Sequence, residues 1–479
     1  MEETKGTNLL QHFLNVGVGT VINVLLGLIT TPLITRIVDP ADYGSFSVFN
    51  SYVDVILALV FIGLDKSLIR FFYNGDNEDK TGLVKLCFVF PIAASLMVFC
   101  VYSLLIYLGI VDSRFAYIYI ILMLSYVLVT VWNRISTTLL RLTYKTKEYS
   151  WCKIIEKIVY TIIIVGYVLA IRKYYFLMLI MAAIIPCAVV ALISTVYTKE
   201  YWNFKGVPFS CSSKEAVVYG VPFIIYSAMI ALLDSLDKFA IDAYCNDYEV
   251  GVYSSGLALV ALFLILKSIF ETVWAPLQTE HYTKNPEDTS FIQKGSRYIS
   301  IIMFFLGLNI IMFKDLICFI LGAKYRGAGA VLPFLFLGAV AYSISDTTVV
   351  GIDYSKKSYM HSIIGGIVIV INFLGNNYLV PIMGITGAAI ATSFSYLVYL
   401  ILRTFFSNRY YYIDFGVKKL FIMFVLLTVF ASVSTFIDKL ILNIVFYLIS
   451  MAVFIFIYRQ DMKDMFVYVF DYLKAYLKK

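Results

Sequence analysis

Long polar segments are almost absent from this sequence of 479 residues, and charged residues are scarce. Lys, Arg, Asp and Glu make up 14% of the chain, whereas an ordinary soluble domain carries about 25%. The longest polar stretch, residues 278–297, is far too short to fold by itself. The sequence therefore excludes a sizeable domain outside a membrane.

Patterns that bind metals or form disulfide frameworks are lacking as well. The seven cysteines are scattered without a CxxC pair, and the three histidines lie at no ligand spacing. Such spacing gives no sign of a zinc site or a disulfide scaffold. We expect no metal and no cofactor, and we expect most cysteines to pack as small apolar side chains.

Apolar segments are what the sequence has instead. About 20 apolar residues cross a bilayer as a helix, and only helices or closed barrels satisfy the backbone there. Barrel strands alternate and are shorter, at about 10 residues. The sequence therefore predicts an all-α polytopic membrane protein with about 14 transmembrane helices. The expected spans are 10–37, 44–64, 83–110, 115–139, 152–171, 174–197, 216–240, 250–273, 298–321, 329–351, 359–380, 383–403, 417–437 and 440–458.

The basic residues alternate in number between the two sides of these spans. With the N-terminus inside, 26 of the 38 lysines and arginines fall on the inner side and 9 on the outer side. The positive-inside rule then places both termini in the cytoplasm. Because topology explains the net charge of +7, we do not expect nucleic-acid binding. Residues 462–479 have apolar side chains at helical spacing, which predicts an amphipathic helix on the inner membrane surface.

Two segments of the first half recur in the second half. Residues 137–149 match 347–359 at five of thirteen positions, at an offset of 210, and residues 42–47 resemble 249–254 at an offset of 207. This similarity predicts a duplicated six-span unit with a cavity between the two lobes, which is typical of transporters. The expected domains are an N-lobe (1–205), a C-lobe (206–410), and spans 13 and 14 with the cytoplasmic tail (411–479).

Six segments carry a resemblance to a known family. They are Thr31–Gly44, Leu64–Phe72, Tyr219–Pro222, Asp237–Lys238, Glu249–Ser254 and Gly384–Thr392. Together they resemble Wzx-type polysaccharide transporters, the O-antigen and capsule flippases of the MOP exporter superfamily. That superfamily also contains MATE drug exporters and lipid II flippases. The family usually has Arg where this chain has Lys238, which weakens the match at that position.

The resemblance implies a flippase and not an enzyme. Such a protein moves an undecaprenyl-pyrophosphate-linked oligosaccharide from the inner to the outer leaflet of the bacterial cytoplasmic membrane by alternating access. It implies a lipid-linked oligosaccharide as substrate, in the pathway of a polysaccharide polymerase and a chain-length regulator. We expect a monomer.

An anionic headgroup needs a polar and preferably cationic cavity, because unpaired polar groups cost several kcal/mol in hydrocarbon. Ionisable residues inside spans are functional candidates. We therefore predict that Arg134 and Lys267 bind the pyrophosphate, although Lys267 could instead pair with Glu271 one turn along the helix. Further substrate-binding candidates, which could equally set topology or bridge helices, are Arg70, Arg36, Asn15, Asn23 and Asn50.

Acidic residues in spans are candidates for energy coupling. A membrane carboxylate can carry a proton or contribute to a Na⁺ site. Our candidates for H⁺ or Na⁺ coupling are Asp54, Asp237, Asp234 and Glu271. A simple ion pair of Asp237 with Lys238 or Arg36 is the main alternative.

Three other functions remain open from the sequence. A MATE-like exporter of small cations would need an acidic cavity, against which Arg134 and Lys267 count. A polysaccharide polymerase or glycosyltransferase generally needs a large outer loop with catalytic groups, and the outer loops here are a few residues long. A structural membrane protein would not need the repeat or the charges within spans.

Overall fold

The computed structural model of the chain contains helices and no strands among the residues that it describes. These are residues 27, 29–74, 76–110, 114–171, 173–209, 213–357 and 359–477, and the side chains of 266, 268–273, 275, 276, 466 and 468–477 are not described. Ten helices in this part of the chain are long and apolar enough to cross a membrane. The predicted class, an all-α multi-pass membrane protein, is therefore confirmed.

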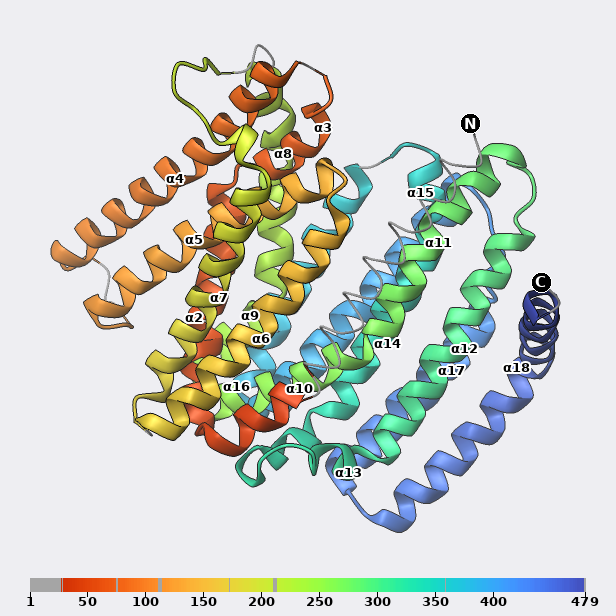
Figure 1. Ribbon diagram of the computed structural model, residues 1–479. Coiled ribbons are helices and arrows are strands. Elements are labelled where there is room, and N and C mark those ends of the chain that lie inside the picture. The colour runs from red at the N-terminus through yellow and green to blue at the C-terminus, as the bar shows by residue number, and fades with distance from the viewer. Residues whose placement is uncertain are drawn as a thin grey trace. The chain divides into compact units, whose positions relative to one another are not determined.

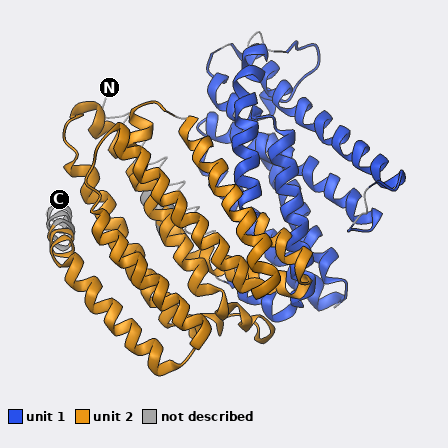
Figure 2. Cartoon of the chain, turned by 180° about the vertical axis from the view of Figure 1, so that it is seen from behind, with its two compact units in different colours: residues 1–235 blue, residues 236–479 orange. Residues whose placement is uncertain are grey.

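Two compact units make up the chain, one ending at Ser235 and the other beginning at Leu236 (Figure 2). The first unit contains a helix over residues 29–37 and then the following elements (Figure 1): α2 (Pro40–Val60), α3 (Leu64–Phe71), α4 (Asn77–Tyr107), α5 (Tyr117–Leu142), α6 (Thr146–Ala170), α7 (Tyr175–Tyr197), η1 (Lys199–Tyr201) and α8 (Ser213–Leu233).

The second unit is built around α14, whose side chains are buried along most of the helix. Helices α10, α12, α16 and α17 pack against it. Its elements are α9 (Leu236–Tyr244), α10 (Asp247–Phe263), α11 (Ile265–Lys284), α12 (Ser290–Met312), α13 (Lys314–Cys318), η2 (Ala323–Ala330), α14 (Leu332–Thr348), α15 (Val350–Tyr354), α16 (Tyr359–Tyr410), α17 (Val417–Ser432), η3 (Val433–Ile437) and α18 (Leu440–Leu477).

Capping residues in the sequence determine where several of these helices begin. The Asp39 carboxylate accepts a hydrogen bond from the Ala41 amide at 3.1 Å, and Pro40 occupies the first turn of α2. Asp76 caps α4 and Asn246 caps α10 in the same way. A capping oxygen satisfies an amide that the first turn leaves without a partner, so these residues fix where the helices begin.

The predicted spans that fall within the described residues correspond to helices, but several of them are broken, and most of span 10–37 lies outside the described residues. Span 44–64 ends in a turn at Phe61–Gly63 before α3, span 216–240 divides into α8 and α9, and span 250–273 divides at Leu264 into α10 and α11. The apolar pattern continues across each break, so hydropathy alone does not reveal it.

The two spans predicted at 359–380 and 383–403 are the halves of α16. They meet at Gly384, whose φ of 57° and ψ of −138° are not helical. Asn372 donates a hydrogen bond to Thr392 at 3.1 Å, and a Cβ on Gly387 would lie 2.3 Å from the Leu379 carbonyl oxygen. The halves therefore lie against each other as an antiparallel pair with almost no loop between them.

The boundary of the compact units differs from the lobe boundary expected after residue 205. Helix α8 belongs to the first unit because it packs on α2 and α3. Residues 411–479 belong to the second unit, where α17 and α18 pack against α12. Residues 462–477 continue α18 and do not form a separate helix. The internal duplication stays a prediction.

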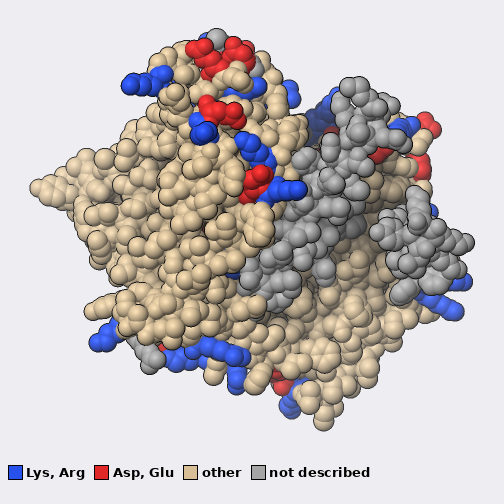
Figure 3. All heavy atoms as spheres, viewed as in Figure 1, with Lys and Arg blue, Asp and Glu red and all other residues tan. Residues whose placement is uncertain are grey.

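The face of the first unit seen in Figure 3 is a broad surface of uncharged side chains, with most charged side chains gathered near its upper and lower edges. Many large apolar side chains of this unit are exposed, among them Leu104, Ile121, Ile162 and Leu169. Exposed apolar surface of this extent is expected where a helix faces lipid.

The turn between α2 and α3 packs directly on α8 through two glycines. A Cβ on Gly63 would lie 2.1 Å from the Gly220 carbonyl oxygen, and Ser67 donates a hydrogen bond to the Ala216 carbonyl at 2.6 Å. Gly63 also has a φ of +67°, where an L side chain costs roughly 1–2 kcal/mol. Both the conformation and the close approach require glycine here.

We predict that Gly63→Ala lowers the apparent Tm of the purified protein more than Gly109→Ala does. Gly109 has a similar φ of +69° but open space where a Cβ would lie, so it carries the conformational cost alone. Thermal unfolding in detergent measures the difference. Equal losses for the two variants would show that the contact with Gly220 contributes nothing.

Candidate functional site

Three charged side chains from three helices of the second unit meet inside its membrane-spanning part. Lys267 of α11 lies with its Nζ 2.7 Å from Asp346 Oδ2 on α14, and Arg403 of α16 donates to the other carboxylate oxygen of Asp346. The Lys267 and Arg403 side chains are each 10% exposed. We call Lys267, Asp346 and Arg403 the charged triad. It holds one more cation than anion.

Aromatic rings support both cations of the triad. Lys267 Nζ lies 3.9 Å from the centre of the Tyr342 ring, and the Arg403 guanidinium lies 4.0 Å from that of Tyr399. The negative face of an aromatic ring attracts a cation, by about 2 kcal/mol where water is excluded. The rings therefore help to hold two like charges around a single carboxylate.

Lys267 has an acidic partner on another helix. That partner is Asp346, while the side chain of Glu271 lies outside the described part of the structure. Asp346 also accepts from Arg403, so neither cation has the carboxylate to itself. The two cations share a single negative charge, so an anionic ligand could bind both of them and offset the remaining positive charge.

The first unit has a smaller ion cluster around Arg134. Arg134 Nη2 of α5 lies 2.9 Å from Asp65 Oδ2 of α3, and Lys66 Nζ lies 3.9 Å from the same oxygen. The Arg134 guanidinium also lies over the Phe61 ring, and its side chain is 46% exposed. Arg134 is thus paired and still accessible.

The two clusters share one arrangement with the charges exchanged. In the first unit the acid lies on α3, the helix after the break, and the base lies on α5. In the second unit the base Lys267 lies on α11, again after a break, and the acid lies on α14. Each unit therefore joins two of its helices with an ion pair, and the two pairs have opposite polarity.

Asp237 lies in a buried polar cluster of the second unit. Its carboxylate accepts hydrogen bonds from Tyr253 at 2.5 Å, Thr392 at 2.6 Å, Asn376 at 2.8 Å and Asn372 at 3.4 Å. The alternative, an ion pair with Lys238, does not form: within the described residues Asp237 has neutral partners only. Donors on α10 and α16 fill its oxygens instead.

One acceptor in this cluster has no hydrogen-bond partner among the described residues. Asn376 donates through Nδ2 to Asp237 and to Asn372, whereas its buried Oδ1 accepts no hydrogen bond. A buried carbonyl oxygen without a donor costs free energy. A carboxylate and an unsatisfied amide oxygen in one buried cluster provide the hard oxygen ligands that small cations prefer.

The remaining predicted residues lie outside these clusters as the structure describes them. Asn50 of α2 is half-buried, and its Oδ1 has no hydrogen-bond partner among the described residues. Asn15 and Asn23 fall in the part of the chain that is not described. The other four candidates are exposed, and they are Arg36, Arg70, Asp54 and Asp234.

Sequence reasoning missed Asp65 and Arg403 as site residues. Asp65 lies in the segment Leu64–Phe72 of the family resemblance, just after the left-handed turn at Gly63. Arg403 ends the predicted span 383–403, and its place four residues after Tyr399 puts the two side chains on one face of the helix. Nothing in the sequence indicates that Asp65 pairs with Arg134, because the two lie on different helices.

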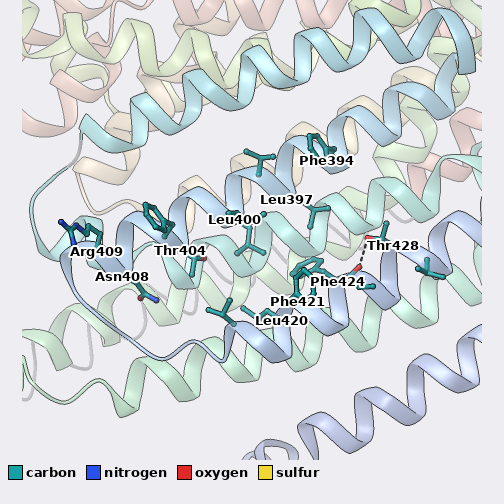
Figure 4. A pocket seen from close by; sticks show the side chains of 16 residues that line it. Phe394, Leu397, Leu400, Thr404, Asn408, Arg409, Leu420, Phe421, Phe424 and Thr428 are labelled. Carbon is teal, nitrogen blue, oxygen red and sulfur yellow. Dashed lines mark hydrogen bonds between the residues drawn. The ribbon is translucent and has the colours of Figure 1, made fainter.

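A pocket of about 780 Å³ lies elsewhere in the second unit, between the second half of α16 and α17 (Figure 4). Phe394, Leu397 and Leu400 line one wall, and Phe421 and Phe424 line the other. The predicted site residues do not line it. Its surface suits hydrocarbon rather than a sugar or a phosphate.

Metal-ligating side chains do not gather in the described part of the chain. No group of three or more His, Cys, Asp or Glu side chains there could hold a metal ion. His281 and His361 form ion pairs with Asp288 and Asp353, at 3.1 and 2.8 Å. Both pairs lie near helix ends and away from the charged triad.

Comparison with known proteins places this chain in a family. The sequence pattern of the family described as "Polysaccharide biosynthesis protein" matches residues 9–281. The chain belongs to this family. No curated protein sequence is significantly similar to the chain.

Solved structures share the fold of this polysaccharide biosynthesis protein at low sequence identity. The lipid II flippase MurJ in an inward closed conformation has a TM-score of 0.68 and 14% identity, over 94% of this chain and 99% of that one. An inward-facing MATE-family multidrug resistance transporter of the MOP superfamily has a TM-score of 0.56 and 12% identity, over 82% and 94%. A point mutant of the Vibrio cholerae MATE transporter VcmN has 0.53 and 14%, over 85% and 98%. The chain thus shares the fold of these flippase and transporter structures.

We predict that Asp346→Asn destabilises this polysaccharide biosynthesis protein by roughly 3 kcal/mol, because it leaves two nearly buried cations without their shared carboxylate. Chemical unfolding in detergent measures the loss. Adding Lys267→Gln should recover part of it by removing one of the two like charges.

Glu280→Gln is the matched control for this prediction. It removes the acid of an exposed pair with Lys284 on α11, and exposed pairs contribute little. An Asp346→Asn protein as stable as the Glu280→Gln protein would contradict a role of Asp346 in holding the two cations.

Proposed function

We propose that this chain is a flippase that moves a polyprenyl-diphosphate-linked oligosaccharide from the inner to the outer leaflet of the bacterial cytoplasmic membrane. Membership of the polysaccharide biosynthesis family and the MOP-superfamily fold support this proposal. The charged triad is the observation that carries it: two cations held within the membrane-spanning helices, with one carboxylate between them.

A lipid diphosphate is the ligand whose charge fits the triad. Moving a diphosphate through hydrocarbon unaided is prohibitive, since isolated charges are expensive to desolvate. Arg and Lys both bind phosphate oxygens, Arg through its planar fork and Lys as a point charge. Lys267 and Arg403 would each bind phosphoryl oxygens while Asp346 keeps the pair together in the empty protein. The prenyl chain is apolar and stays in the lipid.

The cluster around Arg134 gives the first unit a phosphate-binding candidate of its own. Arg134 and Lys66 are both close to half exposed, so an anion can reach them without displacing Asp65 completely. Alternating access needs two states with different affinities for the substrate. We propose Arg134 and Lys66 as the phosphate-binding residues of the first unit, and Lys267 and Arg403 as those of the second.

A MATE-like exporter of small cations is the alternative with a structural argument of its own, the buried carboxylate of Asp237. The triad disfavours it, because an excess of positive charge repels a cationic cargo. A polymerase remains less favoured, since the described residues offer no clustered catalytic carboxylates. The substrate, and a pathway with a polymerase and a chain-length regulator, remain proposals, as do a monomeric state and cytoplasmic termini.

We propose that the Asp237 cluster couples transport to H⁺ or Na⁺. The carboxylate oxygens of Asp237, together with Asn376 Oδ1, can bind a small cation. Intramembrane carboxylates of this kind are typical of ion relays in transporters. We propose Asp237 for this role ahead of the other candidates from the sequence, which are Asp54, the first of them, Asp234 and Glu271.

We predict that Lys267→Gln and Arg403→Gln each reduce translocation of undecaprenyl-diphosphate-linked sugar in proteoliposomes at least tenfold, because each removes one phosphate-binding cation. Lys284→Gln, on the same helix as Lys267 but exposed, is the control and should retain the parent rate. Unchanged rates in both triad variants would refute the phosphate site.

Asp237→Asn should abolish any response of translocation to an imposed Na⁺ gradient or ΔpH, because the amide keeps the shape but loses the charge. Asp242→Asn on the same helix is the control and should respond like the parent. A response of normal size in Asp237→Asn would place coupling elsewhere. If neither gradient accelerates the parent protein, the substrate gradient alone drives transport.

A further inference from the structure

Three tyrosines lie beside the charged triad on facing surfaces of α14 and α16. The Tyr342 ring is 5.2 Å from that of Tyr396 and 6.1 Å from that of Tyr399, measured between ring centres, and stacks on Tyr399 at 19°. All three side chains are only partly buried. We call Tyr342, Tyr396 and Tyr399 the tyrosine platform.

The platform and the triad follow the same two helices. Asp346 lies one turn after Tyr342 on α14, and Arg403 lies one turn after Tyr399 on α16. Tyr396 lies seven residues before Arg403, which is about 10 Å along a helix. A ligand whose diphosphate binds the triad would therefore place its next chemical group against the tyrosine rings.

The three tyrosines lie away from the ends of helices that could span a membrane. Tyrosine is enriched at the two membrane interfaces, where its hydroxyl meets water. Tyr342, Tyr396 and Tyr399 instead lie within α14 and α16, next to Ser345 and the triad. A polar ligand suits partly exposed, polar-tipped rings at these positions better than lipid does.

Sugar rings have the chemistry that such a platform binds. The face of an aromatic ring carries negative charge, and it attracts the slightly positive C–H groups on the flat face of a pyranose. Tyrosine offers this face at little entropic cost, because it has only two side-chain torsions. Phosphate, in contrast, is repelled by a ring face, so the rings and the cations select different parts of one ligand.

We propose that the tyrosine platform stacks the first sugar of the lipid-linked oligosaccharide on Tyr396, while the charged triad, whose cations lie over Tyr342 and Tyr399, binds its diphosphate. This inference rests on the proposed function and adds a sugar subsite to it. Tyr396 is the ring farthest from Arg403 along α16, so it contacts sugar and not phosphate. Because stacking is tolerant of hydroxyl stereochemistry, the platform would accept pyranoses of different identity.

The experiment measures binding of two probes to the full-length protein in detergent: undecaprenyl diphosphate, and the same lipid carrying one N-acetylglucosamine. Tyr396→Leu should weaken binding of the sugar-bearing probe about fivefold, the size expected of one aromatic stacking contact. It should leave binding of the sugar-free probe unchanged. Tyr396→Phe keeps the ring and should bind both probes like the parent.

Two further variants separate the possible results. Tyr396→Gln, a second way to remove the ring, should repeat the selective loss if the Leu variant does not fold. Tyr378→Leu, an exposed tyrosine on the same helix, should bind both probes normally. If Tyr396→Leu and Tyr396→Gln weaken binding of both probes equally, or weaken binding of neither, the sugar subsite is overturned.

Lys267→Gln keeps this test distinct from the test of the proposed function. That variant should weaken binding of both probes at least tenfold, because both carry the diphosphate. If it binds both probes like the parent, the phosphate site fails, whatever the Tyr396 variants do. If it weakens both probes and Tyr396→Leu weakens neither, the phosphate site stands and the sugar subsite fails.

Discussion

The sharing of the Asp346 carboxylate by Lys267 and Arg403 is the interaction on which the second unit's site depends. Two cations within membrane-spanning helices would repel each other and would be costly to desolvate. One carboxylate between them, and the ring faces of Tyr342 and Tyr399, make the arrangement tolerable. Because the acid offsets only one of the two charges, the triad retains an attraction for anions.

In each unit, a break between two helices positions one residue of the ion cluster. Helix α3 begins after the left-handed turn at Gly63 and brings Asp65 to Arg134. Helix α11 begins after Leu264 and brings Lys267 to Asp346. A continuous helix would carry these side chains in another direction. Each break therefore sets the position of a charge that joins its own unit together.

Much of the fold could be predicted from the sequence, because apolar length alone decides where a helix can cross a membrane. The spans at 359–380 and 383–403 were found, although almost no loop separates them at Gly384. The breaks at Gly63, Ser235 and Leu264 were not, since packing and not hydropathy determines them. For the site, the high cost of placing an ionisable side chain within a membrane span indicated Lys267, Arg134 and Asp237. Their partners Asp346, Asp65 and Asn376 lie 69 or more residues away, and no local pattern connects them.

A structure of the protein with undecaprenyl diphosphate bound would test the central claim most directly. We expect the diphosphate within hydrogen-bond distance of both Lys267 Nζ and the Arg403 guanidinium, with the prenyl chain leaving toward the lipid. A diphosphate bound elsewhere, while Lys267 and Arg403 still contact only Asp346, would contradict this account.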